Sequence, residues 1–330
     1  MSAGPTISVI TPVWNGLPYI KECVDSVFSQ EFQDWEFVIS DNGSTDGTRD
    51  YLDSLTDPRV RVFKQAKNLG IDGNLNFLLS QARAPIAYCL CADDYFFSGG
   101  LGRAVQEWSN VPAGTAFIGF NWKEVVKHDM ASAFSYNVLP KELDPKMSRV
   151  AFFLFGNVLG NLSNVSFNVE KLKTGGGFDE RLRMAGDFEI WSRIAKKNIM
   201  VLSDVETVYV RRHEGTATNY LTKQGLLFGE HIAIYETLID EVSAYYNRKQ
   251  LIDYFNIQIC SYHLRESLKG IFYGRITNLK NFLTVKSSIF WPWWKRLTLC
   301  LPFAIYERGR ERLLVQMGQK VINQTIQGQS

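Results

Sequence analysis

The chain has 330 residues, of which 45% are hydrophobic and 21% charged, and this composition excludes an intrinsically disordered protein. Its five cysteines are odd in number and lack paired spacing, which excludes a disulfide framework and favours a reducing cytoplasm. The amino terminus has no basic start followed by an apolar run, and no stretch of about 18 apolar residues occurs. We therefore expect neither a signal peptide nor a membrane-spanning helix.

Strand and helix patterns alternate over the first hundred residues. This alternation predicts an α/β fold with a mostly parallel, doubly wound sheet. Each expected strand is a short apolar run, and each expected helix has apolar residues at three- and four-residue spacing. The expected strands are 7–11, 35–40, 60–63 and 86–91. The first of them should end at Pro12, which has no amide hydrogen. The expected helices begin near Leu17, at Thr48 and, after a loop at 68–73, near Leu75.

The pattern after residue 110 is less regular. It still predicts strands and helices that extend the same fold, followed by an all-helical tail. The expected elements are strands at 115–126, 164–169 and 201–210, a surface loop at 128–145, and helices at 150–155, from Ala185 and from residue 222 onward.

Aromatic and polar residues follow three of the expected strands. Trp14 and Asn15 come after the first strand, Asp41 ends the second, and Asp93 and Asp94 follow the fourth. The carboxyl ends of parallel strands open on one rim, where such sheets bind ligands. An indole and a carboxylate there can bind a nucleobase, and two adjacent carboxylates suit Mg²⁺ or Mn²⁺. Three alternatives stay open: Trp14 in the core, Asp41 in an Asx turn, and the Asp pair in an exposed turn.

Two common phosphate-binding motifs are absent. The turn after the first strand, Val13-Trp14-Asn15-Gly16, lacks the spaced glycines of dinucleotide-binding folds, and the phosphate-binding loop with Gly-Lys-Ser/Thr does not occur. Phosphates would then be held most simply by a metal ion at the Asp pair.

Four motifs stand in order over the first hundred residues: 7–15 (ISVITPVWN), 40–48 (SDNGSTDGT), 68–70 (NLG) and 91–94 (CADD). Together they resemble a family 2 glycosyltransferase of the bacterial polysaccharide type. The resemblance implies a GT-A fold and inverting transfer from a nucleotide-activated sugar. It implies that Trp14 stacks on the nucleobase, that Asp41 bonds it, and that Asp94 coordinates the metal with Asp93 near the ribose or metal. The other nucleotide-binding positions that it indicates are Pro12, Asn15, Asn68, Gly70 and Arg211.

One departure from the family pattern lies after the Asn-x-Gly loop. Many members carry Ala-Arg-Asn there, whereas this chain has Asn74-Leu75-Asn76. The side chain that orients the hydroxyls of the donor sugar is therefore left open.

The candidate general base is Asp187. A glycine run at 175–177 with Phe178-Asp179-Glu180 resembles the family's Gly-Gly-Phe-Asp-Glu segment, and Asp187 then opens a helix. Transfer to a hydroxyl needs a base, and Asp187 matches the acid of the family's Glu-Asp motif, although Gly186 replaces the Glu. The plain alternative is an acid favoured by the helix dipole. Glu189 is the second candidate base, but it points about 200° around the helix.

Arg211 and His213 resemble the family's Arg-x-His loop. A guanidinium and an imidazole near a diphosphate can stabilise the charge of the leaving group. His213 could add one ligand to a metal held by carboxylates. The alternative is a solvated basic surface.

The tail is predicted to touch a membrane. Residues 265–320 carry 11 Lys plus Arg and 3 acids, and subtracting this surplus of 8 from the net charge of +2 leaves −6 for the remainder. Trp293 and Trp294 beside Lys295 and Arg296 have the composition of an interfacial helix. The alternative is a helical pair packed on the preceding domain. The acidic remainder excludes nucleic acid as the expected partner.

Together with these patterns, the resemblance implies a metal-dependent, inverting glycosyltransferase with Mn²⁺ or Mg²⁺ as cofactor. We expect a donor linked to UDP, dTDP or GDP, a glycan acceptor that is lipid-linked, and a cytoplasmic protein peripheral to the inner face of the cell membrane. The alternatives are a nucleotide- or glycan-binding module without catalysis and a nucleotidyltransferase. The expected domains are a catalytic domain at 1–220, split at residue 110 into nucleotide and acceptor halves, and a helical region at 221–330.

Overall fold

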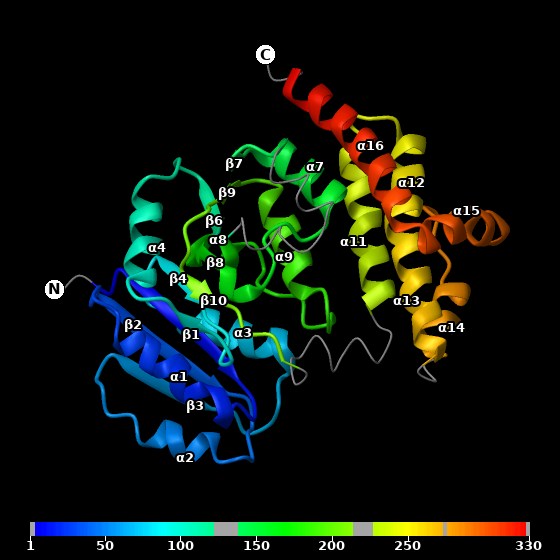
Figure 1. Ribbon diagram of the computed structural model, residues 1–330. Coiled ribbons are helices and arrows are strands. Elements are labelled where there is room, and N and C mark those ends of the chain that lie inside the picture. The colour runs from blue at the N-terminus through cyan, green and yellow to red at the C-terminus, as the bar shows by residue number, and fades with distance from the viewer. Residues whose placement is uncertain (1–3, 122–137, 214–226, 273–275, 328–330) are drawn as a thin grey trace. The chain divides into compact units, whose positions relative to one another are not determined.

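The computed structural model describes residues 4–121, 138–213, 227–272 and 276–327 (Figure 1). The chain forms two compact units, which are described separately. The first comprises residues 1–125, 140–148 and 157–212, and the second comprises 126–139, 149–156 and 213–330. Part of an expected strand (122–126) and part of an expected loop (128–137) lie outside the described residues.

The first unit is built on an eight-stranded mixed sheet, most of whose strands are parallel, as the sequence predicts. β8 runs antiparallel to both of its neighbours, and β7 runs antiparallel to β9. A separate small sheet pairs β5 (Tyr95–Phe96) with β10 (Val208–Tyr209). The order across the large sheet is β3 (Val60–Lys64), β2 (Trp35–Asp41), β1 (Ile7–Val13), β4 (Ile86–Cys89), β8 (Val165–Asn168), β6 (Thr115–Gly119), β9 (Ile199–Leu202) and β7 (Glu142–Leu143).

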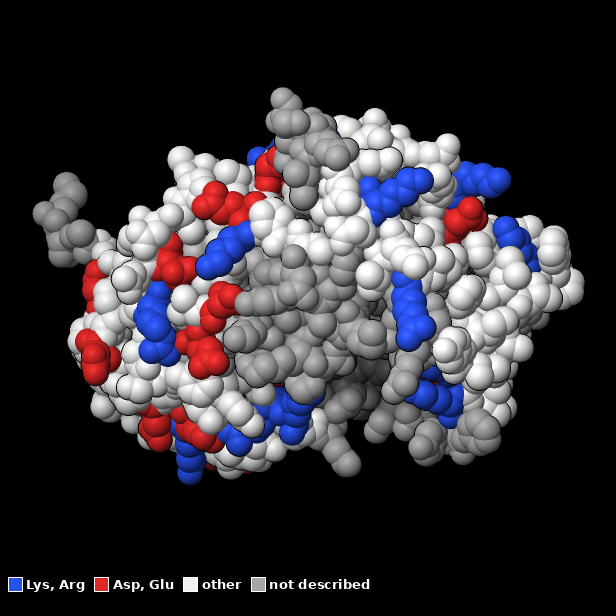
Figure 2. All heavy atoms as spheres, turned by 45° about the horizontal axis from the view of Figure 1, so that its top comes forward, with Lys and Arg blue, Asp and Glu red and all other residues white. Residues whose placement is uncertain are grey.

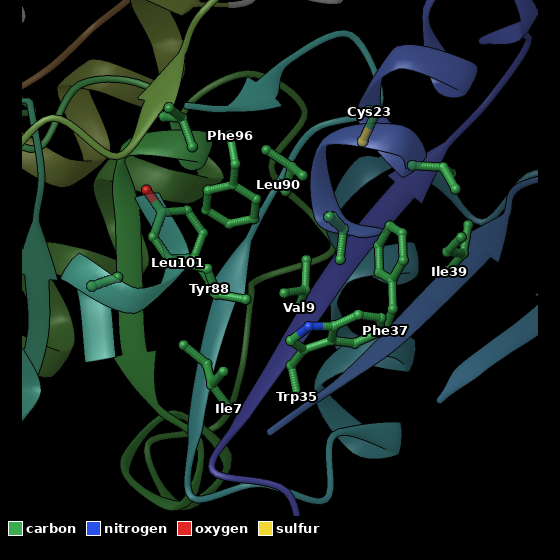
Figure 3. Packing of buried hydrophobic residues seen from close by; sticks show 14 of the residues in the cluster. Ile7, Val9, Cys23, Trp35, Phe37, Ile39, Tyr88, Leu90, Phe96 and Leu101 are labelled. Atoms are coloured by element: carbon green, nitrogen blue, oxygen red, sulfur yellow. The ribbon is translucent and has the colours of Figure 1, made fainter. Parts of the chain in front are cut away.

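Helices cover both faces of this sheet. Alternate residues of β1, β2 and β4 point to one face, where they pack with Cys23 of α1 (Figure 3). α3 contacts β1 and β2 but adds no residue to this cluster, which places it on the opposite face. The described helices of this unit, in chain order, are α1 (Leu17–Phe28), α2 (Thr48–Asp53), α3 (Gly70–Gln81), α4 (Gly100–Ser109), α8 (Val169–Thr174) and α9 (Gly186–Ala195). The boundary between the two units falls inside a further helix, α7 (Pro145–Phe155), after Ser148.

Strand β1 runs through Pro12, so the prediction that it ends there is wrong. The Ile10 carbonyl accepts from the Leu90 amide on the β4 side, and the Val13 carbonyl accepts from the Asn42 amide on the β2 side. Neighbouring residues of a strand point to opposite sides, so Pro12 points toward β4. Pairing with β4 has already stopped at Ile10, and the missing amide hydrogen of Pro12 therefore costs no ladder bond.

The predicted surface loop at 128–145 is wrong at its end, because it contains β7, and the helix predicted at 150–155 already begins at Pro145. Two further boundaries also differ from the prediction. The expected loop at 68–73 is already helical from Gly70, which has φ +79°. The expected strand at 201–210 is split, because the chain leaves the large sheet after Leu202 and joins β5 at Val208. Contacts from distant residues set both boundaries: the Asn42 side chain accepts from the Leu69 amide, and the Asn121 side chain accepts from the Thr207 amide.

The described part of the second unit consists of helices. No helix among the described residues is long and apolar enough to cross a membrane. Asn256, fully buried in a π-helical turn at Asn256–Cys260, donates to the Ile289 carbonyl and accepts from the Trp291 amide. The helices are α11 (Leu227–Val242), α12 (Arg248–Phe255), α13 (Ser261–Phe272), α14 (Thr277–Thr284), α15 (Trp293–Ile305) and α16 (Glu307–Gln327).

Glu36 is a buried carboxylate of β2 with a full set of partners. It accepts from the Ser8 hydroxyl at 2.6 Å, the Arg83 amide at 2.7 Å and the Arg61 guanidinium at 2.8 Å. A buried charge is tolerated only with such partners, because its desolvation costs several kcal/mol. Glu36 thereby joins β2 to β1, to β3 and to the loop that precedes β4.

We predict that Glu36→Ala lowers the free energy of unfolding by about 3 kcal/mol, because it leaves the Arg61 charge partly buried and unpaired. Urea unfolding measures the change. The control is Asp53→Ala, which removes the exposed pair with Lys64 and should cost less than about 1 kcal/mol. Equal effects of the two substitutions would contradict the assignment.

Candidate active site

Trp14 stands at the carboxyl end of β1, and 56% of its surface is exposed. The core alternative for this residue is therefore excluded. The next residue, Asn15, has φ +51° and is clamped to the loop after β2: its amide donates to the Ser44 hydroxyl at 2.7 Å, and its side-chain oxygen accepts from the Thr45 amide at 2.8 Å. These bonds hold the chain around Trp14 while the indole faces solvent.

Asp41 is fully buried beneath this loop. Its carboxylate accepts from the Ser44 amide at 3.1 Å and pairs with the Arg49 guanidinium at 2.6 Å. Asp41 thus holds its own loop, as in the alternative that the sequence left open, but through the amide three residues on and not the amide two residues on of an Asx turn. In this structure Asp41 shapes the loop beside Trp14, and its oxygens are not exposed.

Asn42, which the sequence analysis did not single out, joins two of the predicted motifs. Its side chain donates to the Asn68 side-chain oxygen at 3.1 Å and to the Gly70 carbonyl at 3.0 Å. It also accepts from the Leu69 amide at 2.8 Å. The buried side-chain amide of Asn42 therefore holds the Asn-x-Gly loop at the rim. The only sign of this role in the sequence was the position of Asn42 between Asp41 and Gly43.

The residues at the missing arginine have structural roles. Leu75 is a core residue, and Asn74 is buried with both side-chain atoms bonded to Ser40. Asn76 binds the glycine run: it accepts from the Phe178 amide at 2.7 Å and donates to the Phe178 carbonyl at 2.9 Å. This segment connects α3 to the glycine run. None of its three residues has the positive charge of the missing arginine.

Cys91, Asp93 and Asp94 follow β4 and bring one ligand atom each within 4.8 Å of one another. Asp94 is 2% exposed; one of its oxygens accepts from the Arg211 amide at 2.8 Å, while Oδ2 is buried without a hydrogen-bond partner. Burial and, second, the charge of Asp93 raise the pKa of Asp94 to about 6. An orphaned carboxylate oxygen beside a second carboxylate fits a divalent cation, which would replace the missing partner.

Arg211 lies against this acidic group. Its Nε donates to the Asp93 carbonyl at 2.9 Å, and its guanidinium also pairs with Glu22. The guanidinium lies 4.9 Å from the centroid of the Tyr19 ring. His213 falls in the other compact unit, so its part in a metal site stays a prediction.

Asp187 begins α9 and is held by two donors. Its Oδ1 accepts from the Phe188 amide at 2.7 Å, and its Oδ2 accepts from the Asn157 side-chain amide at 2.9 Å. Burial raises the pKa of Asp187 to about 6, although both hydrogen bonds oppose that shift. The carboxylate therefore has a proton affinity suited to a general base near neutral pH.

Gly186 has a steric reason for standing where the family carries Glu. A Cβ at this position would lie 2.3 Å from Oδ2 of Asp72, a buried residue of α3. The structure thus brings a carboxylate from α3 to the start of α9. The sequence offered no sign of this contact, because the two residues are far apart in the chain.

Glu189, the alternative base, is engaged elsewhere. Both of its oxygens pair with Arg193, at 2.6 and 2.9 Å, and Arg193 in turn donates to the carbonyls of Gly175 and Gly177. Glu189 therefore supports the glycine run, which leaves Asp187 as the better placed base.

One short segment connects the candidate base with the candidate metal group. Asn157 donates to Asp187, and the hydroxyl of Ser163 accepts from the Cys91 amide at 2.8 Å. Six residues span at most roughly 22 Å when extended, which limits the separation of these two contacts. Asn157 also donates to the Gly160 carbonyl at 3.1 Å, which closes the segment on itself.

Comparisons with known proteins show similarity to glycosyltransferases. Residues 8–160 match the model of the glycosyl transferase family 2. The chain is 33% identical over 119 residues to a putative teichuronic acid biosynthesis glycosyltransferase, TuaG, of Bacillus subtilis; the match covers 36% of this chain and 47% of that protein. It is 30% identical over 177 residues to a GalNAc(5)-diNAcBac-PP-undecaprenol beta-1,3-glucosyltransferase of Campylobacter jejuni, covering 50% and 56%. The matches thus span about half the length of these two relatives.

Solved structures show the same fold at low sequence identity. S. aureus TarS 1–349 in complex with UDP-GlcNAc has a TM-score of 0.57 and 18% identity, covering 98% of this chain and 92% of that one. The mannosyltransferase PcManGT from Pyrobaculum calidifontis, in complex with GDP-Man and Mn²⁺, has a TM-score of 0.54 and 19% identity, covering 98% and 87%. The sheet is GT-A-like, and residues 8–160 are similar to glycosyl transferase family 2.

Proposed function

We propose that the protein transfers a sugar, with inversion, from a nucleoside diphosphate donor to a hydroxyl of a glycan acceptor. The observation that carries this proposal is Asp187, a carboxylate with a pKa of about 6, held by Asn157 and joined through residues 157–163 to the acidic group at Asp93 and Asp94. A displacement at a sugar diphosphate needs both a base and a cation site. In this protein one short segment contacts the candidates for both.

The residues divide the reaction between them. The Trp14 indole stacks on the nucleobase, and Asn15 and the loop shaped by Asp41 hold it in place. The acceptor oxygen attacks the anomeric carbon, its proton passes to Asp187, and the bond from that carbon to the diphosphate breaks. Arg211 lies beside the acidic group, where its charge favours the departing diphosphate. A bound divalent cation at Asp94 and Asp93 supplies further charge neutralisation.

Inversion requires the base and the leaving diphosphate to lie on opposite faces of the sugar ring. Asp187 approaches from the acceptor side, and the diphosphate leaves from the side of Asp93 and Asp94. Pro12, Asn68 and Gly70 complete the nucleotide side in this proposal, and His213 is a further ligand candidate for the cation. Complexes of structural neighbours with UDP-GlcNAc, and with GDP-Man and Mn²⁺, support a nucleotide sugar and a divalent cation of this kind.

We place the acceptor on a lipid carrier and the enzyme at the inner face of the cell membrane. The support is a relative whose name describes an undecaprenol-linked substrate, and the basic surplus of residues 265–320. The donor can carry uridine, thymidine or guanosine, since the exposed Trp14 provides a stacking surface that any base fits.

Asp187→Asn should lower turnover by about 10²- to 10⁴-fold, the usual contribution of a general base, and leave nucleotide affinity unchanged. Turnover is measured by release of nucleoside diphosphate, and affinity by calorimetry with UDP, dTDP and GDP. Glu189→Gln serves as the matched control. A larger loss in Glu189→Gln than in Asp187→Asn would transfer the base role to Glu189.

The pH dependence of turnover should follow Asp187. A base must be ionised, so activity is expected to fall as pH drops through about 6. Asn157→Ala removes a hydrogen bond that favours the ionised carboxylate, which should raise the pKa and move the acid limb to higher pH. Asn110→Ala, at the exposed end of α4, should leave the limb in place. If the acid limb of the pH profile stays in place in Asn157→Ala, Asn157 does not influence the pKa of the base.

Asp94→Asn should weaken Mn²⁺ binding by at least about tenfold, because a neutral amide replaces a ligand. Asp93→Asn should have a smaller effect, and Asp25→Asn, exposed on α1, none. Electron paramagnetic resonance of free Mn²⁺, titrated with protein and nucleoside diphosphate, measures the affinity without turnover. Wild-type affinity in Asp94→Asn would remove this residue from the metal site.

A further inference from the structure

Helix α15 exposes an apolar stripe to solvent. Trp294, Thr298, Leu301 and Ile305 are all exposed and follow one another at spacings of four, three and four residues. That spacing places them along one side of a helix. A surface helix ordinarily turns its apolar stripe inward, so the arrangement in α15 is inverted.

The stripe has almost no polar group that could hydrogen-bond to water. Trp294 is 56% exposed, Leu301 40% and Ile305 74%. Thr298 is its one polar member, and the Thr298 hydroxyl donates to the Trp294 carbonyl of its own helix at 2.9 Å. Exposed apolar patches of this kind mark interaction surfaces.

Contacts on the opposite side of α15 fix the rotation of the helix about its own axis. Arg296, Cys300 and Ala304 are buried there. The Arg296 guanidinium donates to the Phe282 carbonyl at 3.3 Å and lies 4.5 Å from the centroid of the Phe290 ring. The Cys300 thiol contacts the Asn256 carbonyl at 3.5 Å. These contacts belong to the second unit alone, and rotating the stripe inward would break all of them.

Charge identifies the kind of surface that covers the stripe. The segment around α15 carries the basic surplus of residues 265–320, and Lys and Arg predominate over the carboxyl-terminal helices on the face drawn in Figure 2. A second copy of the chain would bring two such basic segments together, which costs energy. An anionic lipid surface attracts the same charges, and Trp residues are enriched at its boundary with water.

We propose that α15 is an interfacial anchor whose stripe of Trp294, Leu301 and Ile305 lies in the boundary between the headgroups and acyl chains of an anionic bilayer. This assigns the membrane contact, which the proposed function gives only to the tail as a whole, to one face of one helix. It rests on the membrane location proposed above and is independent of the sugar chemistry. The basic side chains of the segment would remain at the level of the headgroups.

The test is flotation of the full-length protein with vesicles of phosphatidylcholine containing phosphatidylglycerol, at low salt. The variant Trp294→Ser/Leu301→Ser/Ile305→Ser should need at least tenfold more lipid for half-maximal binding. Tyr245→Ser removes a side chain of similar exposure elsewhere in the same unit and should bind like wild type. Brominated lipids should quench the tryptophan fluorescence of wild type and lose most of that effect in the triple variant.

Three results would overturn the proposal: wild type that fails to float with these vesicles, a triple variant that floats like wild type, or a wild-type dimer in solution that the variant converts to monomer. Far-ultraviolet circular dichroism and an unchanged thermal midpoint show that the variant is folded. Asp187→Asn should float normally although it has lost turnover. Failure of the anchor and failure of the transferase function are therefore observed separately.

Discussion

The hydrogen bond from the Asn157 amide to Asp187 determines much of the candidate active site. A carboxylate at a partly buried helix start must find donors, and Asp187 has two: the Phe188 amide of its own helix and the side chain of Asn157. The second donor comes from a segment that also accepts from Cys91 through Ser163. The orientation of the base and the position of the acidic group thus depend on the same few residues.

Packing around α9 follows from the same constraint. Asp72 of α3 fills the space beside Gly186, and Glu189 holds Arg193 against the glycine run. Three carboxylates therefore converge on one end of the helix, and each has a different task. Burial raises the pKa of Asp187, and no ion pair is among the causes of that shift. Glu189 is instead paired with Arg193.

Much of the first hundred residues could be predicted from sequence. Buried parallel strands read as continuous apolar runs, and the four strands, the helices between them and the exposed Trp14 agree with the structure. The errors lie where residues distant in the chain set the boundary. Pro12 stays inside β1 because pairing on its amide side has ended, and α3 starts early because Asn42 binds Leu69 and Gly70. Neither fact has a local signature.

The sequence by itself determined the class of fold, the motif order of family 2, the positions of Asp93, Asp94 and Asp187, and the basic tail, because each depends on local spacing or composition. Only the tertiary structure decided that Asp41 is closed beneath its loop, that Asn157 holds Asp187, and that Asp72 stands where Gly186 leaves room. It also decided which side of α15 faces solvent, since Arg296 and Cys300 are held by residues far away in the chain. Apart from the Asp41–Arg49 pair, these contacts join residues at least 14 positions apart, and side-chain periodicity carries no information about them.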